Sequence, residues 1–421
     1  MANIFIVAPH FPPSALPPSQ RVRLIIPYLK RKGFDATVFT VAHRYREETE
    51  DPWMRELVGR GFECRELRAL PFHWTRKLGL GDLGLRMVPF LLPRLILECW
   101  QRRPDFILWP VPPWYLLMIA PMVRFFTGVP YGVDLIDPWV EDGVSPRGFK
   151  GRVSQWIARA CDGAAMRAAS VVFAVSEGIL DSMRQRYALP DKLCRAIPYG
   201  VDFADFRKVT PPPRESRGGI VARYIGAVWG DGKRPLAQLL KAFSRWAEEY
   251  DVRLEFYGTS YSGKGVVERQ TDDLCRELGL TERMRESPRR VPYRTAVELT
   301  LGADVLMIFG GMLAYYAASK LMGMVASGRP FIAFLHRESS PHKLLEKLKY
   351  PYLVGYSDRD GDTPEEAYPQ LEKVLWELLR GLASFRPIDP EHPLVAQRSA
   401  AGMAGEFCEL IWQQINQQNK K

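Results

Sequence analysis

The chain has 421 residues, of which 47% are apolar and 25% are charged. These fractions are close to those of ordinary globular proteins, and they exclude a chain that is mainly disordered, collagenous or coiled-coil. Lysine and arginine number 58 against 48 acidic residues, so the net charge is +10. This excess favours an anionic partner, namely a phosphate-bearing substrate, a nucleic acid or an anionic membrane surface. The length predicts two or three domains, with two of about 200 residues favoured.

The six cysteines are scattered, at positions 64, 99, 161, 194, 275 and 408. Their spacing fits neither a zinc site nor a disulfide framework, so we expect free thiols in a reducing compartment. The N-terminus has no basic leader, and we expect no signal peptide. The uncharged stretch 106–123 reaches the lower limit for a membrane span. It contains four prolines, which favour strand, loop and helix in a soluble domain.

Short apolar runs alternate with helical patterns in the first half of the chain. A strand over 3–8 precedes a proline-rich loop over 9–18, a helix over 20–32 and a second strand over 34–41. The later elements expected here are a helix over 151–169 and strands over 105–109, 131–136, 170–175 and 196–199. This alternation predicts a parallel sheet with right-handed crossovers.

A linker is predicted over 208–219, where three consecutive prolines and two glycines stand among charged residues. The alternation restarts after it. The elements expected there are strands over 220–225, 252–257, 303–309 and 330–335, and helices over 235–249, 319–327 and 394–415. The simplest arrangement is two α/β domains of similar size that join near residue 210.

Residues 79–84 match the dinucleotide fingerprint GxGxxG. A working fingerprint follows a strand and opens a helix, but the preceding residues 71–77 do not have the pattern of a strand. We therefore interpret this segment as an ordinary loop. The chain also lacks a Walker loop, and neither observation favours a nicotinamide or flavin enzyme.

Two segments of the second half have features of a phosphate site. In GAVWGDGKR, at 226–234, a strand ends in a turn with three glycines and two cations, which resembles an anion nest. In the second segment, two glycines follow a strand, and Ser319 is the expected N-cap of a helix beside Lys320. A solvated turn and a capped helix with a surface lysine are the alternative interpretations.

Five segments together resemble glycosyltransferase family 4. They are HFPPSALPPSQRVR at 10–23, VPYGVDLIDPWVEDG at 129–143, FAVSEGI at 173–179, IPYGVDFADF at 197–206 and ASKLMGMVASGRPFIAF at 318–334. The resemblance implies an α/β protein of the GT-B fold, with two Rossmann-like domains that face a cleft. Residues 1–208 would bind the acceptor and 209–395 the donor, and 396–421 would return to the first domain as a helix with a polar tail.

The resemblance implies transfer of a hexosyl or related sugar from a nucleotide diphosphate sugar to an acceptor, with retention and without a metal or other cofactor. The leaving phosphate would accept the proton, and electrostatic support of that phosphate would be the main catalytic work. Either Lys233 or Arg234 would bind the diphosphate, and Gly258 and Pro292 would line the base pocket. The donor-binding residues implied are Gly226, Lys233, Arg234, Gly258, Pro292, Gly311, Ser319, Lys320 and Leu321.

In the first domain, Asp137 is the catalytic residue we expect, because ligands of open α/β sheets bind at the carboxyl ends of the strands. His10, in the first loop, is the second. Gln20, Arg21 and Asp134 are expected on the acceptor side. The alternatives are a turn aspartate at 137, an exposed histidine at 10, a solvated arginine at 21 and a loop-orienting aspartate at 134.

The chain departs from the family pattern at three positions. The paired glutamates should fall at Tyr315 and Gly323, and the arginine after Gly226 is Ala227. These departures motivate a second hypothesis, a non-catalytic binding or scaffolding subunit with the same fold. A nucleic-acid-binding protein is a third hypothesis, which we do not favour because no reader motif is present and the charge is spread over both halves.

The segment 60–103 mixes nine basic residues, four acids and five aromatic residues. Such a mixture suits an anionic membrane surface, and it also suits an ordinary buried helix. Relatives of the family often use lipid-linked acceptors. We therefore expect a cytoplasmic protein in polysaccharide biosynthesis, with peripheral contact at the inner face of the cell membrane and a glycan or lipid-linked acceptor.

Overall fold

The computed structural model describes residues 1–48, 50–78, 81–140, 148–190, 194–211, 219–260, 267–314 and 317–418. The chain divides into two compact units. The first combines Met1–Pro198 with Ala400–Lys421, and the second is Tyr199–Ser399. The division after residue 198 lies earlier than the predicted boundary after residue 208, so helix α8 (Phe203–Arg207) belongs to the second unit.

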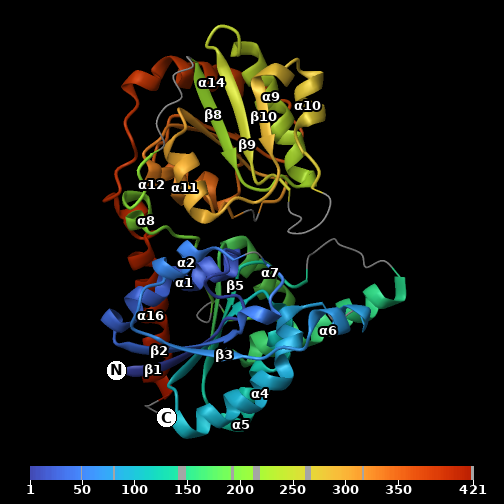
Figure 1. Cartoon of the computed structure of the whole chain (residues 1–421), viewed down its shortest axis with the longest axis vertical. Coiled ribbons are helices and arrows are strands. Elements are labelled where there is room, and N and C mark those ends of the chain that lie inside the picture. Colours follow the sequence, from blue (N-terminus) through green and yellow to red (C-terminus); the bar gives the residue numbers. More distant parts are fainter. Residues whose placement is uncertain are drawn as a thin grey trace. The chain divides into compact units, whose positions relative to one another are not determined.

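The first unit contains a seven-stranded sheet in the order β3-β2-β1-β4-β5-β6-β7 (Figure 1). The described pairings are all parallel. The strands are β1 Ala2–Val7, β2 Phe34–Val41, β3 Glu63–Leu67, β4 Phe106–Val111, β5 Tyr131–Leu135, β6 Val171–Ala174 and β7 Cys194–Ala196. The central strands are apolar throughout because helices cover both faces of a parallel sheet.

The helices of the first unit connect these strands. They are α1 Pro17–Leu29, α2 Pro52–Leu57, α3 Phe72–Thr75, α4 Leu83–Arg102, α5 Ala120–Thr127, α6 Gly148–Ala168 and α7 Glu177–Tyr187. The final helix, α16 Ala400–Gln418, packs against α1, as predicted. Phe407 of α16 lies in the same core as the first strands, and Trp412 donates to the carbonyl of Lys32 at 3.1 Å.

The second unit contains a six-stranded parallel sheet in the order β10-β9-β8-β11-β12-β13. Its strands are β8 Ile220–Ile225, β9 Val252–Tyr257, β10 Met284–Ser287, β11 Val305–Phe309, β12 Phe331–His336 and β13 Leu353–Tyr356. Besides α8, its helices are α9 Lys233–Trp246, α10 Asp272–Glu277, α11 Tyr293–Leu301, α12 Leu321–Ser327, α13 Ser340–Lys347, α14 Tyr368–Gly381 and α15 Pro393–Ala396. One apolar core joins the sheet to α9 and α14.

The predicted α/β architecture with two parallel sheets is therefore confirmed. Three short strands, β3, β10 and β13, were not predicted from the sequence. β3 alternates half-buried and exposed residues, and β10 reads Met-Arg-Glu-Ser, so neither has the apolar run that marks a buried strand. The stretch 106–123 forms β4, a 3-10 helix η4 (Trp114–Met118) and the start of α5. Among the described residues, no helix is long and apolar enough to cross a membrane.

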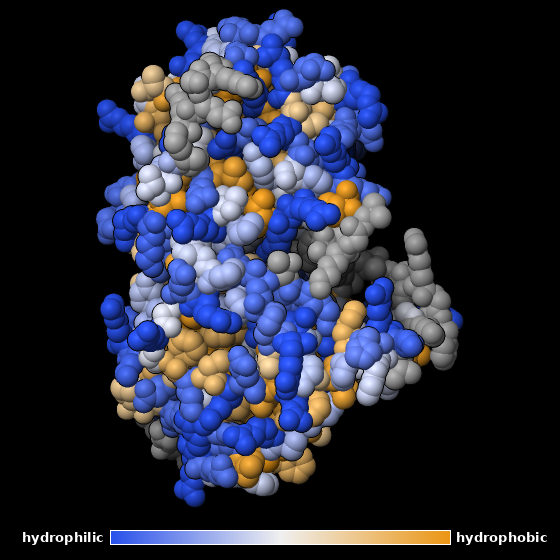
Figure 2. All heavy atoms as spheres, viewed as in Figure 1, coloured by the Kyte–Doolittle hydropathy of each residue, from blue (hydrophilic) through white to orange (hydrophobic). Residues whose placement is uncertain are grey.

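Hydrophilic residues cover most of the face shown in Figure 2. Hydrophobic residues are also visible at the lower end of the first unit, where Figure 1 places α5. Phe125 and Phe126 of α5 are exposed. Part of the surface of this unit is therefore apolar.

Candidate functional site

The order in which the chain adds strands to the second sheet reverses between β8 and β11. From β8 the chain continues through α9 to β9 on one side, whereas β11 leads through α12 to β12 on the other. The segment 226–232 and the described part of 310–320 follow these two strands at their carboxyl ends. Ligands of open α/β sheets bind at such a point, and most of the predicted donor residues lie there.

Lys320 extends from the second of these segments toward β8. Its Nζ donates to the Tyr224 hydroxyl at 2.7 Å and lies 4.0 Å from the centre of that ring. Burial lowers the pKa of Lys320 to about 7. No carboxylate of the described residues forms an ion pair with it. A desolvated ammonium of this kind is stabilised when an anion supplies the opposite charge.

Because Gly226 has no side chain, the Lys320 side chain can occupy the space beside it. Its φ is +148°, and a Cβ at this position would lie 2.9 Å from the Lys320 Cε. A side chain would therefore both strain the backbone and displace the lysine. The sequence predicted Gly226, but it carried no signal for the contact between Lys320 and Tyr224.

Gly311 has a similar role on the other segment. A Cβ there would lie 2.7 Å from the carboxylate carbon of Asp231. Asp231 accepts a hydrogen bond from the Met312 amide at 3.2 Å, and the Gly311 carbonyl accepts one from the Tyr356 hydroxyl at 2.9 Å. The Asp231 contact joins the two segments, and the Tyr356 contact holds the second segment to β13. Asp231 stands inside the predicted anion nest, but it was not recognised as the residue that joins the segments.

The two cations at the start of α9 differ in their partners. Arg234 forms a two-pronged ion pair with Glu365, with Nη2 to Oε2 at 2.6 Å. Lys233 is exposed and forms no ion pair with a described residue. The first amides of α9 and its dipole favour an anion at this end. Lys233 is therefore the cation left available to a ligand.

The predicted base pocket lies at the same edge of the sheet. Backbone hydrogen bonds continue the sheet beyond the strands, from Val228 N to Thr259 O at 2.9 Å and from Gly258 N to Ser287 O at 2.8 Å. Gly258 has φ +69°. Pro292 is the N-cap of α11, which is the helix that follows β10. Gly258 and Pro292 thus lie beyond the carboxyl ends of β9 and β10.

Two of the predicted phosphate contacts need correction. Helix α12 begins at Leu321, and its N-cap is Lys320 without a side-chain hydrogen bond. The N-cap role predicted for Ser319 is therefore wrong, because Ser319 lies exposed in the preceding turn. The Leu321 amide donates to the Ala318 carbonyl at 3.3 Å, so it is already used within that turn.

Gly323 lies beside Phe206 of α8. A Cβ at this position would lie 3.4 Å from the Phe206 ring of α8, so a longer side chain would meet that ring. Tyr315 lies outside the described residues.

At the carboxyl end of β1, His10 pairs with Glu48 at 2.8 Å, and both side chains are largely buried. Burial alone would raise the pKa of Glu48, but the hydrogen bond and charge of His10 bring it down to about 2. Asp82 caps α4 by accepting from the Leu85 amide at 2.9 Å. Burial raises the pKa of Asp82, and the charge of His10 opposes this shift. His10 therefore lies among acidic groups.

Asp137 lies exposed just after β5. Its carbonyl accepts a hydrogen bond from the Trp114 indole at 3.0 Å. Since β5 neighbours β4 and β4 neighbours β1, Asp137 and His10 lie at the same edge of the first sheet. This is the edge at which such folds bind ligands.

Arg21 and Asp134 lie in the interior of the first unit and not at an acceptor surface. They form a two-pronged ion pair at 2.6 and 2.8 Å, and their side chains are 0% and 1% exposed. The Arg21 guanidinium also lies 5.1 Å from the ring centre of Phe407. An acceptor cannot reach groups so deeply buried, and the acceptor-side prediction for this pair is wrong. Its place, between α1, β5 and α16, makes it a structural pair.

Gln20 is half-buried, and its amide is engaged. Its Nε2 lies 3.0 Å from the Met54 sulfur, and its Oε1 accepts from Arg23 at 2.9 Å. Position 20 therefore offers less to an acceptor than the sequence suggested.

Residues 79 and 80 of the GxGxxG segment lie outside the described residues. The described residues before them form α3 and a 3-10 turn, and those after them start α4 behind its cap Asp82. No strand precedes the motif in this part of the chain, which agrees with its interpretation as something other than a dinucleotide site. No cluster of three or more metal-ligating side chains occurs among the described residues.

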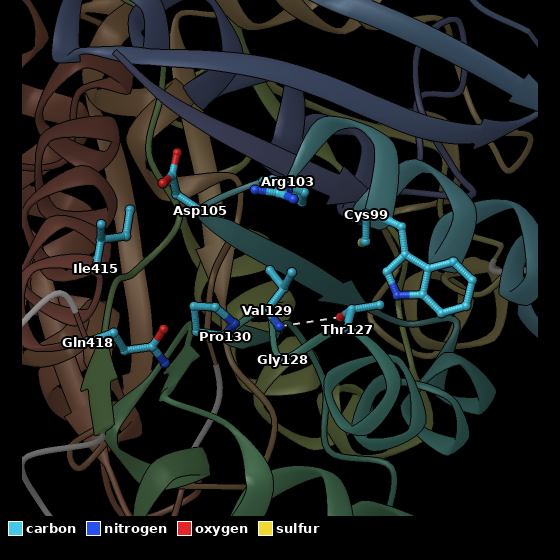
Figure 3. A pocket seen from close by; sticks show the side chains of 11 residues that line it. Cys99, Arg103, Asp105, Thr127, Gly128, Val129, Pro130, Ile415 and Gln418 are labelled. Atoms are coloured by element: carbon cyan, nitrogen blue, oxygen red, sulfur yellow. Dashed lines mark hydrogen bonds between the residues drawn. The ribbon is translucent and has the colours of Figure 1, made fainter. Parts of the chain in front are cut away.

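A pocket of about 570 Å³ lies at the opposite end of the first sheet (Figure 3). It is lined by residues before β4 and β5, including Arg103, Asp105 and Val129, and by Ile415 and Gln418 of α16. Because it lies at the amino ends of the strands, it is separate from the edge that carries His10 and Asp137.

Comparison with known proteins agrees with this geometry. Residues 18–200 match the profile of a family described as glycosyl transferase 4-like domain. This part of the chain is similar to a glycosyl transferase 4-like domain. The match confirms the predicted resemblance for the segments that lie within residues 18–200. No curated protein sequence matches the chain.

Solved structures extend the likeness to both units of this transferase-like chain. Sucrose-phosphate synthase from Thermosynechococcus elongatus has a TM-score of 0.63 at 14% identity, over 98% of this chain and 99% of that one. HepE from Anabaena, in complex with UDP and glucose, has a TM-score of 0.62 at 14% identity, over 98% and 100%. UDP-GlcNAc 2-epimerase from Neisseria meningitidis, bound to UDP-GlcNAc, has a TM-score of 0.55 at 12% identity, over 98% and 100%. The chain has the GT-B fold, as predicted.

Proposed function

We propose that this protein transfers a sugar from a nucleotide diphosphate sugar to an acceptor. The observation that carries the proposal is Lys320, a desolvated ammonium without a described carboxylate partner at the point where the second sheet changes direction. A diphosphate supplies the charge that this ammonium lacks. The UDP and glucose bound by HepE, together with the family match, support a uridine nucleotide sugar as the first donor to test.

In this proposal the diphosphate binds to Lys320 and Lys233. Gly226 and Gly311 allow the two loops to come close, which shapes the space for the phosphates. The base lies toward Gly258 and Pro292. A protonated Lys320 would stabilise the charge that develops on the leaving phosphate, and this stabilisation would be the main contribution to the rate.

We assign transfer with retention, without a metal or other cofactor, and with proton acceptance by the leaving phosphate. Asp137 and His10 are assigned to the positioning of the acceptor hydroxyl, because both lie at the carboxyl edge of the first sheet. The acceptor would be a glycan or a lipid-linked intermediate of polysaccharide biosynthesis, used at the inner face of the cell membrane. No nucleic-acid partner is proposed.

A second function is favoured by one observation. Position 323 is a glycine, so the ribose contact that the family pattern assigns to a glutamate there is absent from this helix. A non-catalytic subunit that binds a nucleotide sugar would tolerate this loss. Such a subunit binds the donor and does not cleave it, whereas the transferase cleaves it at least slowly with water in place of the acceptor. A 2-epimerase is less well supported, because the family match is to a transferase domain.

The two cations of α9 give a direct test of the donor site. Lys233→Ala should weaken UDP-glucose binding about tenfold, since it removes one charge-assisted contact. Arg234→Ala should change the affinity less than about twofold, because its guanidinium is committed to Glu365. Isothermal titration calorimetry measures both affinities.

A control removes the carboxylate that the second variant would expose. Arg234→Ala/Glu365→Ala should bind UDP-glucose as the parent protein does. If the arginine variants lose binding and Lys233→Ala retains it, the assignment of the phosphate cation is reversed. If the parent binds neither UDP-glucose nor any other nucleotide sugar, the proposed function is rejected.

Asp137→Asn separates donor binding from chemistry. The variant should bind UDP-glucose within about twofold of the parent, and its rate of UDP release in water should fall at least about a hundredfold, as expected for the loss of a group that positions the attacking oxygen, which is that of water in this assay. Chromatographic detection of UDP measures this rate. Equal rates in parent and variant would remove Asp137 from the mechanism. A parent that binds UDP-glucose and releases no UDP would favour the non-catalytic subunit.

A further inference from the structure

Three neighbouring helices of the first unit, α4, α5 and α6, expose large apolar side chains, together with η4 between them. We name this surface the α4–α6 face. The side chains of Phe125, Trp156, Trp100 and Phe126 are 83%, 71%, 59% and 53% exposed. Its exposed apolar residues are Leu97, Trp100, Met118, Met122, Phe125, Phe126, Val153 and Trp156.

This clustering exceeds what an ordinary surface requires. Single exposed apolar residues are common, but adjacent exposed aromatic residues on several elements indicate an interaction site. Trp100 of α4 and α5 are joined directly, because the indole donates to the Phe126 carbonyl at 3.2 Å. The apolar side chains of α4 and α5 thus belong to one surface.

The charge on the α4–α6 face has one sign. The three helices contain two acidic residues, Glu98 and Asp162, and both are buried. The exposed cations on and beside the same helices are Arg94, Arg103, Arg152, Arg159 and Arg167. Of these, Arg94 is paired with Glu98 at 2.6 Å. The face therefore offers arginines and no exposed carboxylate from its helices.

The pocket of Figure 3 opens at the edge of this face. Trp100, Arg103, Thr127 and Gly128 line it. Arg103 ends α4 with a left-handed backbone and forms no ion pair with a described residue. The nearby carboxylate of Asp105 accepts from the Asn3 amide at 2.7 Å. A cation and an aromatic ring therefore both line this pocket.

We propose that the α4–α6 face docks on an anionic phospholipid bilayer. Aromatic and methionine side chains would enter the boundary between headgroups and acyl chains, and the arginines would bind lipid phosphates. Arg103, beside the pocket, would hold one such phosphate. Charge complementarity favours this partner, because a one-sign surface with a large apolar fraction fits a bilayer of anionic lipid. The proposal does not depend on sugar transfer.

The test uses sedimentation of the full-length protein with vesicles, without nucleotide. We expect binding to vesicles of phosphatidylglycerol and phosphatidylcholine, and little binding to phosphatidylcholine alone. Phe125→Ser/Phe126→Ser and Arg152→Glu/Arg159→Glu should each lower the partition coefficient at least about tenfold. Arg245→Glu/Arg276→Glu is the matched control, because it changes the net charge equally at exposed arginines of the second unit. It should keep at least half of the binding.

Each other result overturns the proposal. If the parent does not bind to anionic vesicles, the proposal is rejected. If both charge-reversal pairs lose vesicle binding equally, the binding depends only on the net charge of the protein. A concentration-dependent dimer that Phe125→Ser/Phe126→Ser abolishes, without vesicle binding, assigns the face to a second copy. Salt-sensitive RNA binding that outcompetes the vesicles assigns it to nucleic acid. Thermal melting of every variant shows whether it is folded, and UDP-glucose titration shows whether its donor site is intact. A loss of vesicle binding in a variant that passes both tests is then assigned to the α4–α6 face.

Discussion

Lys320→Met should weaken the binding of UDP-glucose about a hundredfold. The ammonium is held by the Tyr224 hydroxyl and has no described carboxylate partner, so a bound diphosphate would be its counter-charge. Loss of a charge-assisted contact in such a site costs about 3 kcal/mol, which corresponds to about a hundredfold in affinity. Isothermal titration calorimetry of the parent and the variant measures this loss. Lys373→Met, on an exposed part of α14, is the matched control and should bind as the parent does.

The same lysine predicts how the affinity depends on pH. Its pKa is about 7 in the free protein, and only the protonated form attracts the diphosphate. A bound anion raises that pKa, so the affinity is highest below pH 7 and falls as pH rises above 7. The diphosphate of UDP-glucose is esterified at both ends and carries no group that titrates in this range.

Two variants make the pH profile decisive. Lys320→Arg should retain binding at pH 9, because a guanidinium stays charged, and Lys320→Met should give a low and flat profile. If the parent keeps the same affinity between pH 6 and pH 9, Lys320 is not the titrating cation. If the parent and Lys320→Met fall in parallel, another group accounts for the pH dependence.

Arg21→Met should destabilise the first unit by about 3–5 kcal/mol. The substitution leaves the carboxylate of Asp134 buried without the two guanidinium hydrogen bonds that it now accepts. Asp134→Leu should cost a similar amount, because it strands the guanidinium instead. Urea unfolding, followed by hydrogen exchange of β5 peptides, measures the change in the unit that contains both residues.

The double variant distinguishes a structural pair from a ligand site. Arg21→Met/Asp134→Leu should recover most of the lost stability, since an apolar pair of similar volume can replace a buried ion pair. UDP-glucose affinity should stay within about twofold of the parent in the folded double variant, because the second unit carries the donor residues. A stable Arg21→Met protein with normal unfolding would refute the structural role and return Arg21 to the acceptor side.

The sequence by itself determined the class of fold. Apolar runs such as 34–41 and 220–225 coincide with β2 and β8, because strands of a parallel sheet are buried on both faces and lack polar alternation. It also located the loops that follow two central strands of the second sheet. Gly226 and Gly311 mark the ends of β8 and β11, and local backbone requirements of this kind can be recognised in a short window of sequence.

Only the tertiary structure decided which side chains meet. Arg21 and Asp134 are 113 residues apart, Lys320 and Tyr224 are 96 apart, and no local pattern links the members of either pair. Arg234 was distinguished from Lys233 in the same way, by Glu365 at a separation of 131 residues. Periodicity reports which face of an element is buried. Pairing, pKa and burial depend on neighbours that the fold brings from distant segments, and these decided that Arg21 is buried in an ion pair and that Lys320 meets the Tyr224 hydroxyl.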